Sequence, residues 1–178
     1  MQDVDGIELV YRNGYFCMVF GEEFYCDYIR LMNLTSPEKK KKETPGAIRA
    51  EWLEILLRGK FIPASESDLF DYYKQKVETL IHSLLPGQLE LAYGDARFSI
   101  VIRLCNILFI ADPLSDLALA YTVCALRKQN NQEEAIRRYA AFTKDYRRVM
   151  NEEYGIAFAD IKVCLLYTSP SPRDTERS

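Results

Sequence analysis

Two stretches of the chain carry the same pattern: Gly94–Arg103, which reads GDARFSIVIR, and Asn130–Tyr139, which reads NNQEEAIRRY. In both, polar turn residues come before a run whose apolar residues recur at helical spacing. The offset between Gly94 and Asn130 is 36 residues (130 − 94). A repeat of this length is typical of stacked helical units, each of which buries its apolar face only against its neighbours. The pattern therefore predicts an array with a binding surface rather than a catalytic pocket.

The offset is close to the period of about 34 residues found in tetratricopeptide (TPR) helix pairs. Helical spacing of apolar residues continues from Thr44 to Gly155, where Gly ends the last helix. Within this range we expect a break or kink at Pro86-Gly87, an N-cap at Asp112 and another N-cap at Asn131. The predicted fold is mainly α, a TPR-like array of α-helical hairpins.

A β-hairpin is predicted before the helices, over residues 7–20. Apolar and polar residues alternate from Ile7 to Arg12, and Tyr15–Phe20 is rich in aromatic residues. Asn13-Gly14 between them favours a type I′ turn, which needs positive φ at both central positions. A lone hairpin is only marginally stable in water, so it must pack on the helices or belong to a sheet that this chain does not contain. A short helix is expected over residues 23–34.

These patterns divide the chain into four regions. We expect the hairpin and short helix in residues 1–34, a polar Lys-rich loop in 35–46, a TPR-like helical domain in 47–160 and a disordered tail in 161–178. The loop contains Lys39–Lys42 between Glu38 and Glu43, with no aromatic residue interleaved. This arrangement favours a solvated loop over a phosphate-binding site.

The end of the chain differs in composition from the residues before it. Ser169–Pro172 reads SPSP and cannot continue a helix. From about Val163 onward the sequence resembles a translated sequencing adapter. We therefore expect this tail to be an artefact of a truncated source, and the alternative is a natural disordered tail.

Composition and charge exclude several classes of protein. The chain has 178 residues, a formal net charge of −3 and 48% hydrophobic residues. Binding to phosphates needs a basic face, so this chain by itself is not expected to bind nucleic acid. No apolar run reaches the roughly 18 residues that a membrane span requires. The five cysteines are dispersed without a C-x-x-C pair, which suits a reducing cytoplasm.

No residue pattern predicts catalysis. His82 is the single histidine, and no other His or Cys stands at metal-ligand spacing from it. The pairs Glu22-Glu23 and Glu133-Glu134 are adjacent in sequence, and adjacent side chains on a helix point about 100° apart, so they do not converge on a substrate. We expect no enzyme activity, no catalytic residue, no cofactor and no metal.

Four segments, in this order, carry a likeness to a known family. They are Leu56–Pro63 (LLRGKFIP), Ile110–Asp116 (IADPLSD), Ala125–Tyr139 and Glu152–Ile156 (EEYGI). Together they make residues 49–160 resemble the bacterial transcriptional activator domain, the TPR-like module of SARP-type transcriptional regulators. Asn130 stands where that family usually has Gly, and Asn tolerates the left-handed conformation of the turn. Ser99 stands where TPR units prefer Ala.

The resemblance implies a non-catalytic regulatory domain from a bacterial transcriptional regulator. In that family a winged-helix DNA-binding domain precedes this module. Residues 1–34 are then the end of such a domain or the linker from it, and the chain is a fragment. DNA binding is implied only for the missing part of the parent protein.

The first helix of each pair lines the concave face of a TPR-like array. In the second repeat this helix directs five residues toward a partner: Leu117, Ala120, Cys124, Arg127 and Lys128. We expect a protein partner or self-association through this face, in the cytoplasm, with no membrane and no metal. Two alternatives remain open: a solvated face around Arg127 and Lys128, and a general TPR-like adaptor or scaffold unrelated to transcription.

Overall fold

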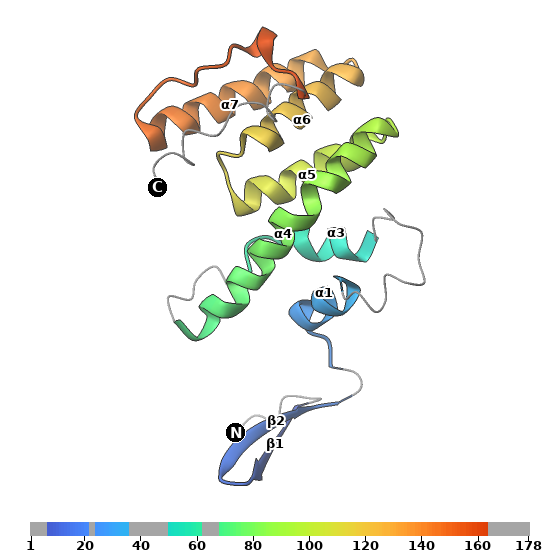
Figure 1. Ribbon diagram of the computed structural model, residues 1–178, viewed down its shortest axis with the longest axis vertical. Helices are drawn as coiled ribbons and strands as arrows, with labels where there is room; N and C mark the ends of the chain where they lie inside the picture. Colours follow the sequence, from blue (N-terminus) through green and yellow to red (C-terminus); the bar gives the residue numbers. More distant parts are fainter. Residues whose placement is uncertain (1–6, 22–23, 36–49, 62–67, 164–178) are drawn as a thin grey trace. The chain divides into compact units, whose positions relative to one another are not determined.

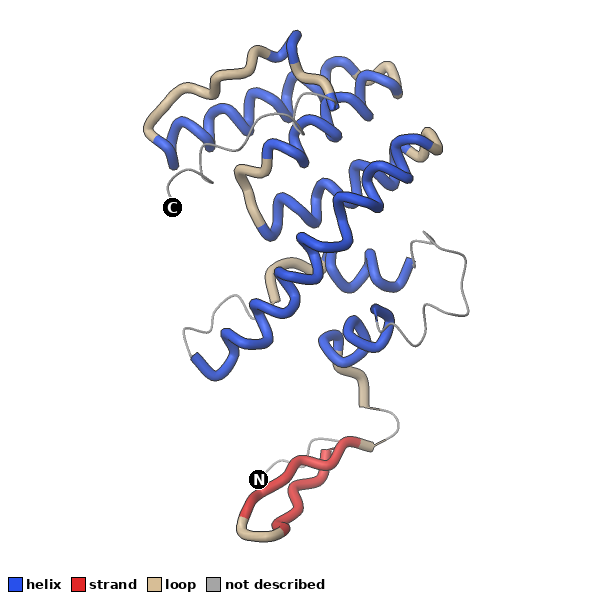
Figure 2. Tube along the Cα trace, viewed as in Figure 1, coloured by secondary structure: helices blue, strands red, loops and turns tan. Residues whose placement is uncertain are grey.

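The computed structural model describes residues 7–21, 24–35, 50–61 and 68–163. These residues are mainly helical, with an antiparallel β-hairpin at the start (Figures 1 and 2). The chain divides into two compact units, Met1–Ala47 and Ile48–Ser178. Three sequence predictions lie outside the described residues: the Lys39–Lys42 loop, the Glu22-Glu23 pair and the tail from residue 164.

The first unit contains the predicted hairpin. Strand β1 (Ile7–Arg12) pairs antiparallel with β2 (Tyr15–Phe20). The turn residues Asn13 and Gly14 have φ angles of 53° and 86°, the positive values that a type I′ turn needs. The hairpin prediction is therefore confirmed, including its turn.

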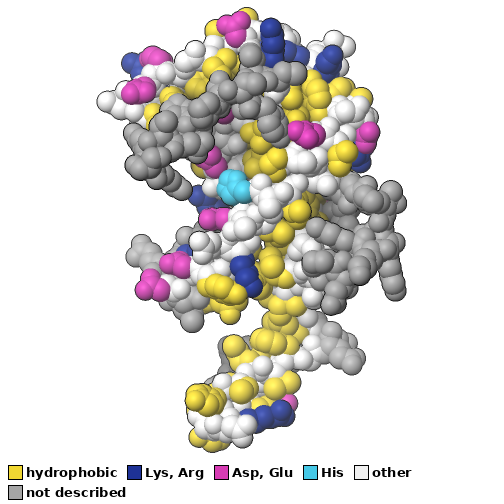
Figure 3. Space-filling view, in the orientation of Figure 1, with side chains coloured by type: hydrophobic (Ala, Val, Ile, Leu, Met, Phe, Trp, Pro, Cys, Tyr) yellow, Lys and Arg dark blue, Asp and Glu magenta, His cyan; other side chains and the backbone are white. Residues whose placement is uncertain are grey.

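One face of this hairpin is wholly apolar. Cross-strand partners share a face, and on one face the pairs are Ile7 with Phe20, Leu9 with Met18, and Tyr11 with Phe16. Phe16 is 73% exposed and Tyr11 is 63% exposed. The space-filling view shows hydrophobic side chains over the hairpin (Figure 3).

A short helix, α1 (Asp27–Thr35), follows the hairpin and starts four residues after the predicted position (27 − 23). The delay has a local cause. The amide of Phe24 donates to the carbonyl of Gly21 in a turn (3.0 Å), and the Phe24 ring stacks on Phe20 with centroids 4.3 Å apart. The helix therefore begins only after this turn.

The second unit is a series of helices: α3 (Ala50–Leu57), α4 (Asp68–Gly94), α5 (Phe98–Ala111), α6 (Asp116–Lys128) and α7 (Gln132–Met150). Each helix from α4 to α6 packs against the next one in sequence, and α3 packs on α5 (Figure 1). A short 3-10 helix, Phe158–Asp160, follows α7. The prediction of a mainly helical fold is confirmed for the described residues.

The turns that end α4 and α6 have the same structure. Ala96 and Asn130 both adopt the left-handed conformation, with φ of 57° and 58°. In each turn, the amide of this residue donates to the carbonyl three residues back, and the next amide donates to the carbonyl five residues back. This is the Schellman arrangement, which satisfies the last carbonyls of a helix. The two turns are 34 residues apart (130 − 96), so the sequence alignment of Gly94 with Asn130 was wrong by two residues.

Buried side chains repeat with the same offset of 34. The equivalent pairs are Leu85 and Leu119, Leu89 and Val123, Ala92 and Leu126, Val101 and Ala135, and Leu108 and Phe142. In each pair both members are buried. Val101, rather than the exposed Ser99, therefore takes the position of Ala135.

Two predicted breaks between helices differ from the structure. Helix α4 does not break at Pro86, because it continues to Gly94. Leu85 and Leu89, both fully buried, fix the helix on either side of this proline. Packing therefore outweighs the lost backbone hydrogen bond.

Asp112 is not the N-cap of α6. It is the C-cap of α5, and its carboxylate accepts a hydrogen bond from the amide of Leu114 (3.0 Å). Ser115 caps α6 instead, because its side chain accepts from the amide of Ala118 (3.3 Å). A short turn thus separates the two helices where the sequence predicted a direct restart.

Helix α7 starts as predicted and ends early. The side chain of Asn131 accepts from the amide of Glu134 (3.3 Å), which confirms the predicted N-cap. The helix ends at Asn151, which is left-handed with φ of 55°, and not at Gly155. Asn tolerates this conformation, so no glycine is needed at the end of the helix.

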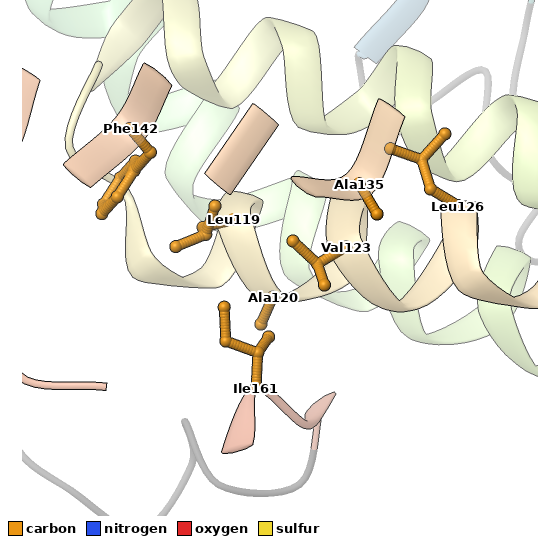
Figure 4. Close-up of a cluster of buried hydrophobic side chains, with 7 residues drawn as sticks. All are labelled: Leu119, Ala120, Val123, Leu126, Ala135, Phe142 and Ile161. Carbon is orange, nitrogen blue, oxygen red and sulfur yellow. The ribbon is translucent and has the colours of Figure 1, made fainter. Parts of the chain in front are cut away.

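Helix α6 is the centre of the unit. Its buried residues run almost without a gap around the helix: Ala118, Leu119, Ala120, Tyr121, Thr122, Val123, Ala125 and Leu126. One cluster joins it to α7 and to Ile161 in the segment after α7 (Figure 4). Because α6 packs on several sides, it has no purely solvent-facing stripe along these residues.

Candidate protein-interaction site

The five predicted partner-binding residues all lie on α6. Three of them, Ala120, Cys124 and Arg127, contact other residues of the same chain. Ala120 is buried against Ile161, while Cys124 and Arg127 are half-buried. Leu117 is half-buried and Lys128 is exposed. The residues that cover this face come from the segment 154–163, which we call the C-terminal strap.

The strap follows α7, forms the 3-10 helix Phe158–Asp160 in its second half and turns its larger side chains inward. Tyr154, Ile156 and Phe158 are half-buried, and the residues between them, Gly155 and Ala157, are exposed. This alternation is typical of an extended segment lying on a surface. The strap runs beside α7 in the view of Figure 2.

Arg127 is the main contact of the strap with α6. Its Nη1 donates to the carbonyl of Ile161 (3.0 Å) and its Nη2 donates to the carbonyl of Phe158 (2.6 Å). The guanidinium also lies over the Phe158 ring, 4.3 Å from the centroid. The planar guanidinium supplies several donors and a stacking face at once, so one side chain fixes two points of the strap.

Tyr139 of α7 fixes a third point. Its hydroxyl donates to the carbonyl of Ile156 (2.8 Å). Its ring packs edge-on against Phe158, with centroids 5.4 Å apart. The helix pair therefore binds the main chain of the strap as well as its side chains.

Ile161 lies near the end of the strap, inside the apolar cluster. It is 4% exposed and points toward Ala120 of α6 (Figure 4). The sequence prediction placed residue 161 at the start of a disordered tail, so the boundary at 160 divides a packed segment. Burial of an isoleucine side chain contributes about 2 kcal/mol, which offsets the entropic cost of ordering that residue.

Tyr154 anchors the other end of the strap. Its ring packs on Phe142 (5.0 Å between centroids) and Tyr146 (5.1 Å) of α7. Burial raises the pKa of the Tyr154 hydroxyl, and the neighbouring carboxylate of Asp116, which accepts its hydrogen bond, raises the pKa further. The hydroxyl therefore stays protonated as a donor to the start of α6.

A small hollow lies under the strap. It is lined by Leu119 and Ala120 of α6 and by strap residues, including Tyr154, Ile156 and Ile161. Its lining is almost entirely apolar, with Asp160 and Lys162 at the rim. Such a lining suits aliphatic side chains.

Each arginine of α7 forms an ion pair. Arg137 and Arg138 pair with Glu134, Arg147 with Glu153 (2.8 Å), and Arg148 with Asp145 (3.0 Å). The hydrogen bond from Arg138, followed by that from Arg137, lowers the pKa of the Glu134 carboxyl. Of the pair Glu133-Glu134, Glu134 therefore serves ion pairing at the start of α7.

The remaining chemical candidates stand apart from this site. His82 is exposed on α4. Among the described residues, no group of three His, Cys, Asp or Glu side chains is placed to hold a metal ion. None of the helices in the described part of the chain is long and apolar enough to cross a membrane.

The sequence prediction missed the strap, although it found the helix that the strap contacts. Gly155 predicts the end of a helix, whereas the residues around it alternate with a period of two. Tyr154, Ile156 and Phe158 carry that signal in the sequence. The role of Arg127 in binding carbonyls had no signal of its own, because its partners lie 31 and 34 residues away.

The chain was compared with protein-family models, curated proteins and solved structures. None of these matches it.

Proposed function

We propose that this chain is a regulatory, protein-interaction module of a bacterial transcriptional regulator. The observation that carries the interaction role is the structural repeat of 34 residues, which relates two helix pairs through identical turns and five buried positions. This spacing equals the period of about 34 residues typical of TPR units, which bind proteins. The transcriptional role is supported by the resemblance described above.

Charge supports an interaction with protein rather than DNA. The net charge is −3, and each arginine of α7 forms an ion pair with an acid. A DNA-binding surface needs unpaired cations that release counterions from phosphates. In this proposal, DNA is bound by another domain of the parent protein.

A reporter experiment tests the transcriptional role. The full chain is fused to a heterologous sequence-specific DNA-binding domain, and transcription is measured from a promoter that carries the matching operator. We expect the fusion to change transcription relative to the DNA-binding domain alone. Unchanged transcription, with the operator shown to be occupied, would favour the alternative of a general TPR-like adaptor.

A binding experiment tests whether this chain by itself binds DNA. Anisotropy of a labelled DNA duplex is measured with the purified chain between about 50 and 200 mM salt. We expect no salt-dependent binding. Tight binding with a salt slope of several released ions would contradict the proposal.

A further inference from the structure

Side chains of α6 and α7 bind the strap through its main-chain carbonyl groups, which every peptide has. Three of its carbonyls, those of Ile156, Phe158 and Ile161, accept hydrogen bonds from side chains of α6 and α7. Main-chain contacts of this kind give affinity to an extended peptide of any sequence, and side-chain pockets give selectivity. The α6–α7 face therefore has the two elements of a peptide-binding groove.

Selectivity in this groove comes from side chains at fixed spacing. Phe158 lies between the Arg127 guanidinium and the Tyr139 ring. Ile161, three residues later, packs on Ala120. Together with Ile156, these residues define an occupant with an aliphatic residue, an aromatic residue two positions later and an aliphatic residue three positions after that.

The strap also covers a position on α6 that the repeat makes equivalent to a position on α4. With the offset of 34, Arg127 of α6 is equivalent to Tyr93 of α4. Tyr93 is covered by Tyr121 of α6, the first helix of the next pair (5.5 Å between centroids), and Arg127 is covered by Phe158 of the strap. The strap therefore lies on α6 where another repeat unit would pack.

We propose that the α6–α7 face binds a short peptide of a partner protein in the conformation of the strap, and that the strap occupies this face as an intramolecular competitor. A partner segment with the spacing of Ile156, Phe158 and Ile161 then binds by displacing the strap. The inference deepens the proposed function, because it rests on an interaction role for this array. A tethered competitor has an effective concentration in the millimolar range, so it blocks weak ligands and admits strong ones.

The test uses the full chain and a labelled peptide with the sequence of the strap, residues 154–163. The variant Ile161→Asp places a charge in the apolar cluster and releases the strap, and Ala157→Asp changes an exposed residue of the strap as its matched control. We expect fluorescence anisotropy to show the peptide binding Ile161→Asp at least about tenfold more tightly than the wild type or Ala157→Asp, because the tethered competitor is removed. Circular dichroism verifies that each variant is folded.

Arg127 provides the second arm of the test. Adding Arg127→Ala to Ile161→Asp should abolish peptide binding, and Arg127→Lys should restore little of it, because an ammonium lacks the planar fork. Absence of binding to a folded Ile161→Asp chain would overturn the proposal. Equal binding to Ile161→Asp and the wild type would also overturn it.

If Ile161→Asp does not fold, hydrogen exchange in a milder variant tests the proposal instead. In Tyr139→Phe, which loses one hydrogen bond, amides of the strap should exchange hydrogen faster while the buried amides of α5 stay unchanged. Strap amides that exchange only through global unfolding would show that the strap is a fixed part of the core, against the proposal.

The two proposals fail in different ways. Peptide binding by Ile161→Asp with no effect in the transcription reporter leaves the groove in place and contradicts the transcriptional role. A reporter effect without any peptide binding contradicts the groove and leaves the transcriptional role in place.

Discussion

Ala96 occupies a conformation that suits glycine or asparagine better. Its φ of 57° places the Cβ atom close to its own backbone, while Asn130 fills the equivalent position of the next turn. The turn is retained because its two hydrogen bonds and the buried residues on either side determine it. The first repeat therefore tolerates local strain that the second repeat avoids.

Replacing Ala96 by Gly should stabilise the protein. Relief of the left-handed strain exceeds the added entropy of the unfolded chain, so we expect the free energy of unfolding to rise by about 1 kcal/mol. Ala157→Gly is the matched control, because Ala157 is exposed and has φ of −67°. Urea unfolding measures both variants, and a gain in the control that equals the gain at Ala96 would contradict the argument.

At the scale of the element, caps decide where the helices begin. Ser115 and Asn131 each accept a hydrogen bond from the amide three residues later. Asp112, although it is followed by a proline, caps the end of α5 and not the start of α6. An N-cap is therefore identified by the geometry of its bond, and sequence alone does not distinguish Asp112 from Ser115.

Removing the cap of α7 should cost stability. Asn131→Ala leaves an amide of the first turn without its side-chain acceptor, so we expect a loss of about 1 kcal/mol in the free energy of unfolding. Gln132→Ala, at the next and equally exposed position, is the control and should change stability little. Thermal unfolding of both variants checks this, and equal losses would show that the cap has no specific role.

The sequence predicted the helices and strands better than it predicted the breaks between them and their long-range contacts. Asn13-Gly14 set the hairpin turn correctly because a two-residue turn depends on the φ of those two residues alone. The predicted break at Pro86 does not occur because buried leucines on both sides hold α4 together, and that packing is non-local. The alternation of the strap is visible in the sequence, but its contacts with Arg127 span more than 30 residues and could not be predicted from local pattern.

At the scale of the whole molecule, the buried thiol of Cys105 makes the free energy of unfolding depend on pH. The side chain lies fully buried on α5, and burial raises its pKa from 9.0 to about 12, against the opposite effect of a hydrogen bond with Thr122. Below pH 9.0 the thiol is protonated in both the folded and the unfolded chain. Between pH 9.0 and about 12 only the unfolded chain releases the proton, so stability falls over that range.

We expect Cys105→Ala to flatten this alkaline loss. The wild type should lose about 1.4 kcal/mol more per pH unit than the variant, which is the contribution of one proton. Cys17→Ala removes an exposed thiol and should leave the slope of the wild type unchanged. Urea unfolding between pH 8 and 11 measures the slopes, and parallel curves for Cys105→Ala and the wild type would disprove the assignment.

The hairpin near the start of the chain has a consequence for the protein in concentrated solution. In the part of the chain that the structure describes, its sheet has two strands, so the outer main-chain groups of each strand are free to pair with another molecule. Its apolar face, with Phe16 and Tyr11 exposed, adds the low charge and high β-propensity that promote ordered aggregation. We therefore expect the hairpin to promote self-association of this protein at high concentration.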